Sequence, residues 1–477
     1  MRDRLIIALF TGIYLAAAAA GIVAFATVTP SRDITRSLPD MDGAETRAAA
    51  IDEVTIGENF QRFPIADPEA DAEDYPWPGF RGPRRDNIAD NAPPLGHDWP
   101  PDGPPLRWRI SLGEGYAAPV VAKQRVYVLD YLEEEKADAL RCFSLKDGGE
   151  LWRRSYYNDI RRNHGKSRTV PAVATDTVVT IGPRAHVMAV DAISGDLLWT
   201  RDMIRQDGTE VPQWYTGQCP LVDGDRAILA PAGDNALLLA INLRTGDTIW
   251  SLPNHLGLKM SHSSVMIMTL HEVKQYVYAG LGGIIGVSMD GELLWSSRDW
   301  QPPVWAPSPV QISQDRLFLT AGYGMGSALL QVTHDQNGWQ AALLDKWKPT
   351  LAPAAEQQTP IFHQGMLFTI QPKDAGARRA QLVAADPSRL PDIVAASGRE
   401  MRFGIGPFLL ADDKFWILDD DGQLSILAFQ DNAFTLLGRH RVLPGVDSWG
   451  PIALAGDLML VRDSTSMACL ELKRTNP

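Results

Sequence analysis

Cysteine is scarce in this sequence, positive charge is outnumbered, and the nine histidines show no metal-ligand spacing. Three cysteines among 477 residues cannot form a framework of several disulfides, and none belongs to a CxxC zinc motif or a CxxCH haem-attachment motif. The chain has 45 Lys and Arg against 58 Asp and Glu, which gives a formal net charge of −13. Because no basic patch spans a domain, nucleic-acid binding is not expected. No metal site is predicted.

The longest uncharged run lies at the N-terminus. Residues 5–28 carry no charged side chain, and Arg2 and Arg4 precede them. A bilayer is spanned by about 20 apolar residues, whereas the core of a signal peptide has about 7–15. The positive-inside rule then places the first residues in the cytoplasm. The sequence predicts a signal anchor or transmembrane helix over residues 1–29, in the inner membrane, with the rest of the chain in the periplasm. Cleavage at the small-x-small motif of residues 24–26, which would release the chain into the periplasm, is the alternative.

Composition divides the remainder into three parts. Between residues 40 and 74 there are eleven acidic and two basic residues, with little apolar periodicity. Such a segment buries too little apolar surface to offset the entropy of ordering it. We therefore expect an acidic flexible tether over residues 30–74. Residues 75–105 are expected to form a lead-in segment that packs on the main domain, residues 106–477.

A short pattern recurs in the main domain. Each copy ends in tryptophan, with glycine four residues earlier and Ser, Thr or Asp five residues earlier; the copies are Ser144–Trp152, Asp191–Trp199, Asn242–Trp250 and Val287–Trp295. Polar residues followed by glycine suit a tight hairpin with a left-handed position. The tryptophan that begins the next strand offers a large apolar body for packing against a neighbouring sheet. A repeated hairpin of this kind indicates an array of small sheets rather than one or two sandwiches.

A second landmark sets the length of the repeat. A small or apolar strand begins every 44 to 52 residues, at Pro119, Pro171, Pro220, Ser264, Pro309, Pro360, Pro407 and Pro451. This interval is typical of a four-stranded propeller blade. The eighth unit has room for only three strands, and residues 106–110 supply a fourth, with Trp108 at the tryptophan position. The sequence predicts an all-β, eight-bladed β-propeller of four-stranded blades, closed by this N-terminal strand. Trp108, Trp152, Trp199, Trp250 and Trp295 are its expected structural tryptophans.

The motif Asp-x-x-Ser/Thr-Gly-x-x-x-Trp resembles the repeat of the PQQ-like (pyrroloquinoline quinone) propellers. The resemblance covers roughly residues 106–473, is strongest in the first four blades, and includes the lead-in Trp77–Asn87. The family contains quinoprotein dehydrogenases and also non-catalytic members such as BamB of the outer-membrane assembly machinery. The resemblance therefore implies the fold but leaves two classes of function open.

The dehydrogenase alternative requires a particular cofactor site. In that branch of the family a quinone stacks between a tryptophan and a vicinal disulfide, with calcium beside it. Here Cys142, Cys219 and Cys469 are far apart, and no calcium ligand set can be carried over, although Trp305 and Trp449 offer stacking surfaces. We expect three buried free thiols, no cofactor and no catalytic residue. PQQ and calcium belong only to the alternative, a PQQ-dependent alcohol or sugar dehydrogenase.

Two groups of residues are candidates for binding. The loops that enter the innermost strands are expected to line the mouth of the channel with Arg168, Gln218, His262, Trp305, Gln358, Phe403 and Trp449. They would bind a small anion or a peptide, or simply fill the channel. A basic loop between the first two blades carries Arg161, Arg162, His164, Lys166 and Arg168. It would bind an anion, a lipid headgroup or an acidic partner, or remain a solvated loop.

These observations favour an exported, membrane-anchored propeller that acts as a non-catalytic protein-binding or assembly scaffold in the cell envelope. Its loops, or the edge of a blade, would engage an envelope protein. The sequence does not identify that partner.

Overall fold

The structure is a computed structural model that describes residues 12, 15–20, 54–68, 75–163 and 165–474. It divides into two units, Met1–Val54 and Thr55–Pro477. Within the first unit, residues 12 and 15–20 are helical, and the rest of the expected anchor lies outside the described residues. None of the helices that are described is long and apolar enough to cross a membrane.

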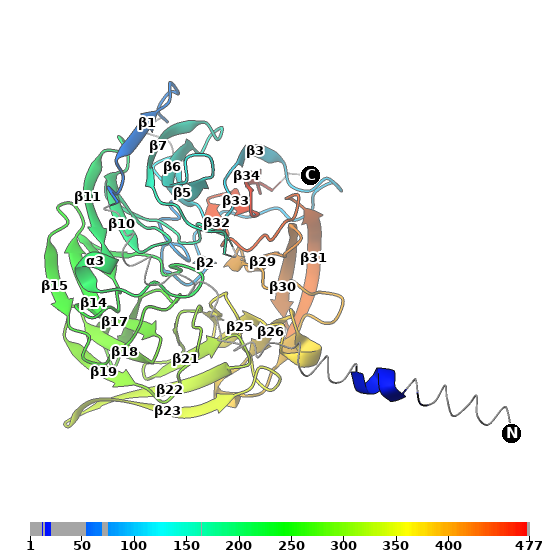
Figure 1. Ribbon diagram of the computed structural model, residues 1–477. Coiled ribbons are helices and arrows are strands. Elements are labelled where there is room, and N and C mark those ends of the chain that lie inside the picture. The colour runs from blue at the N-terminus through cyan, green and yellow to red at the C-terminus, as the bar shows by residue number, and fades with distance from the viewer. Residues whose placement is uncertain (1–11, 13–14, 21–53, 69–74, 164, 475–477) are drawn as a thin grey trace. The chain divides into compact units, whose positions relative to one another are not determined.

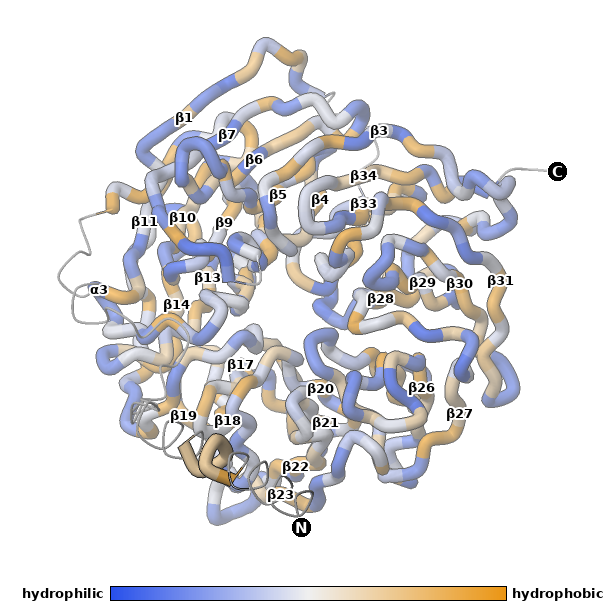
Figure 2. The backbone as a smooth tube through the Cα atoms, turned by 45° about the vertical axis from the view of Figure 1, so that its right-hand side comes forward, coloured by the Kyte–Doolittle hydropathy of each residue, from blue (hydrophilic) through white to orange (hydrophobic). Residues whose placement is uncertain are grey.

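In the second unit the described residues form eight sheets, arranged as blades around a central axis, and the four strands of each blade pair antiparallel (Figures 1 and 2). Blades 1 to 4 consist of β4 (Val120–Ala122), β5 (Arg125–Leu132), β6 (Ala137–Ser144) and β7 (Glu150–Tyr157); β8 (Ala172–Ala174), β9 (Thr177–Ile181), β10 (His186–Asp191) and β11 (Leu197–Asp202); β12 (Leu221–Asp223), β13 (Arg226–Leu229), β14 (Leu238–Asn242) and β15 (Thr248–Leu252); and β16 (Met266–Leu270), β17 (Val273–Gly280), β18 (Gly283–Ser288) and β19 (Leu293–Ser297). A short helix, α3 (Met203–Asp207), follows β11.

The other four blades follow the same order. Blades 5 to 8 consist of β20 (Val310–Gln311), β21 (Arg316–Ala321), β22 (Gly326–Asp335) and β23 (Gly338–Trp347); β24 (Ile361–His363), β25 (Met366–Ile370), β26 (Leu382–Ala385) and β27 (Ala395–Ala396); β28 (Phe408–Ala411), β29 (Lys414–Leu418), β30 (Gln423–Gln430) and β31 (Ala433–Arg441); and β32 (Ala453–Ala455), β33 (Leu458–Arg462), β34 (Ser466–Glu471) and β3 (Leu106–Ser111). Blade 6 also carries two 3₁₀ turns, η1 (Gly376–Arg378) and η2 (Pro387–Arg389).

The predicted blade register and ring closure are confirmed. Each predicted starting residue lies one or two positions before the first strand of its blade. The N-terminal strand β3 pairs antiparallel with β34, and Trp108 lies opposite Cys469. The last blade thus receives its fourth strand from the beginning of the domain, which joins the two ends of the array and locks the ring.

The repeated tryptophans join neighbouring blades. Trp152 of blade 1 lies over Gly195 in the hairpin of blade 2, where an added Cβ would be 2.8 Å from the indole. Trp108, Trp199 and Trp250 lie in the same way over the hairpin glycines of their next blades, Gly148, Gly246 and Gly291. All four glycines have positive φ, between 73° and 91°. Glycine is therefore required twice, for the left-handed turn and for the close approach of the indole. Trp295 instead donates to Gln275 within its own blade, at 2.6 Å.

The expected burial of the cysteines is also confirmed. All three are free and buried. Cys142 is paired with Trp152 on the neighbouring strand, and Cys469 is paired with Trp108 in the same way. The two cysteines therefore occupy equivalent places in adjacent blades. Burial raises the pKa of the Cys219 thiol to about 11 and that of Cys469 to about 12, which keeps both thiols protonated.

Part of the expected tether differs from its prediction. Residues 59–62 form β1 (Asn59–Arg62), which pairs antiparallel with β7 as a fifth strand of blade 1. All four residues of β1 are exposed, so they leave no apolar periodicity in the sequence. The strand is held by backbone pairing and by Phe60, whose ring lies 4.5 Å from the Arg154 guanidinium. The rest of the expected tether lies outside the described residues, except for residues 54–58 and 63–68.

Candidate binding face of the propeller

The strand order gives the ring two different faces. Because the four strands of a blade alternate in direction, the connections between second and third strands lie on the same face as those between blades. We call this the long-loop face. The turns after the first and third strands lie on the other, the hairpin face. All the predicted channel-mouth residues and the predicted basic loop belong to the long-loop face.

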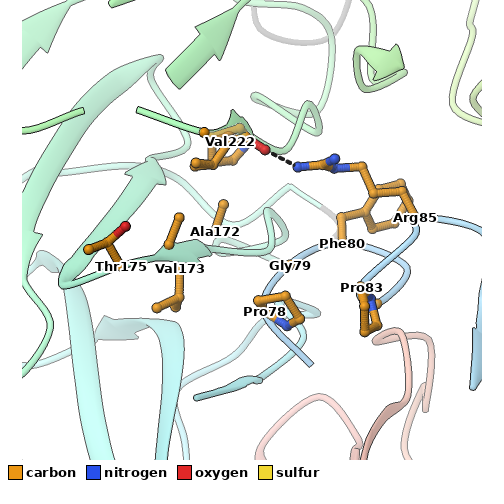
Figure 3. Close-up of a pocket in the computed structure, with 13 residues that line it drawn as sticks. Pro78, Gly79, Phe80, Pro83, Arg85, Ala172, Val173, Thr175 and Val222 are labelled. Atoms are coloured by element: carbon orange, nitrogen blue, oxygen red, sulfur yellow. Dashed lines mark hydrogen bonds between the residues drawn. The ribbon is translucent and has the colours of Figure 1, made fainter. Parts of the chain in front are cut away.

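On the hairpin face the lead-in segment ties inner strands together. Trp77 forms a β-bridge with Val121 of blade 1, and the Pro78 carbonyl accepts a hydrogen bond from the backbone of Val173 in blade 2, at 2.7 Å. The Arg85 side chain donates to the backbone carbonyl of Val222 in blade 3 (Figure 3). Three neighbouring blades therefore share one continuous strap.

The same segment continues to the opposite side of the ring. Arg81 is buried and donates to the carbonyl of Pro360, at the start of blade 6, at 2.8 Å. The Asn87 side chain donates to Phe408 of blade 7, and β2 (Ile88–Ala89) pairs parallel with β28. Leu95 forms a β-bridge with Lys473 beside blade 8. The segment thus contacts six blades.

A cavity of about 370 Å³ lies between the lead-in segment and blades 2 and 3. Figure 3 shows Pro78, Pro83 and Arg85 on one side and Val173, Thr175 and Val222 on the other. Burial lowers the pKa of Arg85 to about 10, so the guanidinium remains charged at neutral pH. Its hydrogen bond to Val222 bridges the two walls, which suits a structural strap.

The structure distributes the predicted channel-mouth residues among different roles. Gln218 is fully buried and exchanges two hydrogen bonds with the backbone of Ala230, at 2.8 and 2.9 Å. Phe403 is fully buried in the core of blades 6 and 7. Trp305 is fully buried, with Trp300 edge-on to it at 5.1 Å between ring centres. These three side chains support the blades from within.

His262 belongs to an aromatic stack that sequence reasoning missed. Trp214 stacks with His262 and with Tyr323, whose ring centres lie 6.2 and 5.8 Å from its own. The Lys373 ammonium lies 5.5 Å from the centre of the Tyr323 ring. Burial and the positive charge of Arg168 lower the pKa of His262 to about 4, so the imidazole is neutral at physiological pH. The stack joins loops of blades 3 to 6 on the long-loop face.

Gln358 and Trp449 meet on the other side of this face. The Gln358 amide lies 3.5 Å from the Trp449 carbonyl, and the Trp449 indole donates to Asp420 at 2.9 Å. The ring of Tyr116 packs on Trp449 at 5.0 Å. The Gln358 amide, the Trp449 indole and the Tyr116 ring are therefore already engaged by neighbouring groups of the protein.

The predicted basic loop is largely neutralised by its surroundings. Arg162 pairs with Glu114 at 2.7 Å, and Lys166 pairs with Glu133 at 2.7 Å. Arg168 donates to two carbonyls of its own loop, those of Asn163 and Gly165, at 2.9 and 3.0 Å. The remaining loop candidates are Arg161, which is exposed and whose carbonyl accepts from the Tyr215 hydroxyl, and His164, which lies outside the described residues. The loop is shaped by internal pairs, with Arg161 as its outward charge.

The residues present do not fit a stacked quinone. Cys142, Cys219 and Cys469 belong to blades 1, 3 and 8, so they provide no vicinal pair. Trp305 is buried against Trp300, and one side of Trp449 is covered by Tyr116. Within the described part of the chain, no group of three or more His, Cys, Asp or Glu could hold a metal ion.

Comparisons with known proteins agree with this architecture. The family described as outer membrane protein assembly factor BamB, a PQQ-like repeat family, matches residues 101–210 and 136–389. BamB from Moraxella catarrhalis is similar in structure, with 11% identity, a TM-score of 0.51, and coverage of 78% of this chain and 99% of that one. No curated protein matches the sequence.

Two quinohemoprotein alcohol dehydrogenases are similar to the same degree. The ADHIIG enzyme of Pseudomonas putida HK5 has a TM-score of 0.55 and the enzyme of Comamonas testosteroni 0.53. Each is 11% identical, and each comparison covers 84% of this chain and 81% of the other. At this identity the likeness establishes a common fold.

Proposed function

Because this chain belongs to the PQQ-like repeat family described as outer membrane protein assembly factor BamB, we propose that it is a non-catalytic scaffold that binds a protein partner in the cell envelope. The observation that carries the proposal is that the candidate chemical groups are already engaged by other groups of the protein. Gln218, Trp305 and Trp449 each serve packing or hydrogen bonding within the protein. The long-loop face then acts as a rigid platform rather than as a reaction site.

Rigidity comes from how the ring is closed. The Arg462 side chain of blade 8 is fully buried and donates to the carbonyls of Gly113 and Ala117 on the way into blade 1, at 3.3 and 2.9 Å. Together with β3, this clasp joins the two ends of the array. A closed ring holds its loops in fixed relative positions, which reduces the entropy lost on binding.

The proposed location is the periplasmic side of the inner membrane. In this arrangement residues 1–29 are the anchor, and the acidic residues that follow separate the propeller from the bilayer. The uncharged run of residues 5–28 supports this proposal. Release into the periplasm after cleavage is the competing arrangement.

The proposal is tested by photo-crosslinking in cells. A crosslinking amino acid is placed at exposed positions of the long-loop face, Leu351 and Val446, and at Asp225 of the hairpin face as a control. We expect a discrete protein adduct from the long-loop positions and none from Asp225. Calcium-dependent, saturable binding of PQQ, with oxidation of an alcohol or sugar, would overturn the proposal in favour of a quinoprotein dehydrogenase.

A further inference from the structure

The long-loop side of blade 6 carries a concentration of positive charge on this acidic protein. We define the blade 6 patch as Lys373, Arg378, Arg379, Arg399 and Arg402. The first three belong to the loop between β25 and β26, and the last two to the connection between blades 6 and 7. These residues are 29 positions apart at most, so the structure, rather than one basic run, brings them together.

Hydrogen bonds join the two loops into one surface. The Arg402 side chain donates to the carbonyls of Ala377, at 3.3 Å, and of Arg399, at 3.3 Å. The Phe403 backbone donates to Ala380 at 2.7 Å. The cationic side chains are therefore presented from a preformed backbone, and a ligand would not have to order it.

The patch keeps its charge outward. Lys373, Arg378, Arg379 and Arg399 are exposed, and Arg402 is half-buried. Within the described residues, the ion pairs of blade 6 and its entry loop are Lys373–Glu356 at 3.3 Å and Arg389–Asp392 at 3.8 Å; neither involves the four arginines of the patch. The predicted basic loop of blade 1 differs, because Arg162 and Lys166 there are paired with glutamates.

Two large apolar side chains flank the charges. Tyr323 is 48% exposed beneath Lys373, and Leu351 is 60% exposed in the loop that enters blade 6. That loop adjoins the patch, since a Cβ on Gly376 would lie 3.5 Å from Thr350. Arginine and tyrosine are enriched at the energetic centres of protein interfaces, and Leu351 adds exposed apolar area beside them.

We propose that the blade 6 patch, with Tyr323 and Leu351, binds an acidic segment of a protein partner. This inference rests on the proposed scaffold function and names the chemistry of its partner. Arginine guanidinium groups pair with carboxylates through two parallel hydrogen bonds, which a flexible lysine does not do. Glu400 lies exposed next to Arg399, so a protein segment that alternates acidic and uncharged residues matches the patch better than a uniformly anionic membrane surface does.

A direct binding assay tests the patch. The probe is a fluorescein-labelled 16-residue peptide of alternating acidic and Tyr or Leu residues, and its partner is the full-length chain in non-ionic detergent. The patch variant is R378E/R379E/R399E. The matched control, K146E/R244E/K346E, changes the net charge by the same amount at exposed positions elsewhere, so it corrects for long-range electrostatics. We expect the patch variant to bind the peptide at least about tenfold more weakly than the wild-type protein does. The control variant should bind it less than about twofold more weakly.

Three outcomes would overturn the inference. These are equal losses for the two triple variants, equal binding of a peptide with Gln and Asn in place of the acids, and patch-dependent binding to phosphatidylglycerol vesicles without binding to the peptide. Failure of the inference is separable from failure of the scaffold proposal. If crosslinked adducts persist in the patch variant, the partner binds elsewhere on the long-loop face. If no adduct forms with the wild-type protein, the scaffold proposal fails as well.

Discussion

Replacing Gly246 with alanine perturbs the junction between blades 2 and 3 in two ways. Gly246 has φ of +79°, and an added Cβ would lie 2.6 Å from Cγ of Trp199. Trp199 is almost fully buried and donates to the Leu243 carbonyl at 2.9 Å, so it has little room to shift. The variant therefore combines backbone strain with a steric conflict between blades.

A second glycine separates these effects. Gly224 has φ of +62°, but a Cβ there would meet nothing within 4 Å. For Gly224→Ala we expect a loss of about 1–2 kcal/mol in the free energy of unfolding, from the left-handed backbone alone. For Gly246→Ala we expect about 1–3 kcal/mol more, the usual cost of overpacking.

The assay is urea unfolding of both variants and the wild-type protein, followed by tryptophan fluorescence and by circular dichroism. Equal losses for the two variants would refute the reasoning, because they would mean that the tryptophan and glycine contact adds nothing to the joining of blades. A double-mutant cycle provides a further check: in the Trp199→Phe background, Gly246→Ala should cost less than in the wild-type protein, because the smaller ring relieves part of the steric term but none of the backbone term.

Three other predictions follow from buried charges and from the N-terminus. Burial raises the pKa of Asp138 from 3.8 to about 7, so the folded state favours the protonated acid. The stability that the protonated acid contributes to the folded state is fully present below about pH 4 and is lost as the pH rises through 7. Asp138→Asn should therefore gain stability relative to wild type between pH 5 and 8, by at most about 4 kcal/mol, in thermal or urea unfolding at each pH; a pH-independent difference would contradict this. Arg462→Met should cost about 3–5 kcal/mol in urea unfolding because it leaves buried carbonyls unpaired, whereas Arg298→Met, which removes an exposed arginine that also donates to two carbonyls, should cost about 1 kcal/mol. The intact mass of protein extracted from membranes should include residues 1–29, and a mass lacking about the first 26 residues would establish cleavage instead.

The blade register could be predicted because its signals are local. In blade 2 the Asp191 carboxylate accepts hydrogen bonds from the backbone of Ile193 and Ser194, and Gly195 takes the left-handed position that follows. A turn of this kind depends on residues adjacent in the chain, so its residue types recur wherever it recurs. The candidate binding site was harder to predict from the sequence. Gln218 and Phe403 belong to the predicted loops, but their side chains are buried inside the blades.

The sequence by itself determined the number of blades, the strand that closes the ring and the burial of the cysteines, because these depend on turn chemistry and apolar spacing. Only the tertiary structure decided which parts of the protein the exposed or irregular segments contact. β1 has no buried residue, Trp214 meets Tyr323 across more than a hundred positions, and Arg378 and Arg399 come together through loop hydrogen bonds. Such contacts depend on how the closed ring places distant loops, and no local pattern of residues encodes that placement.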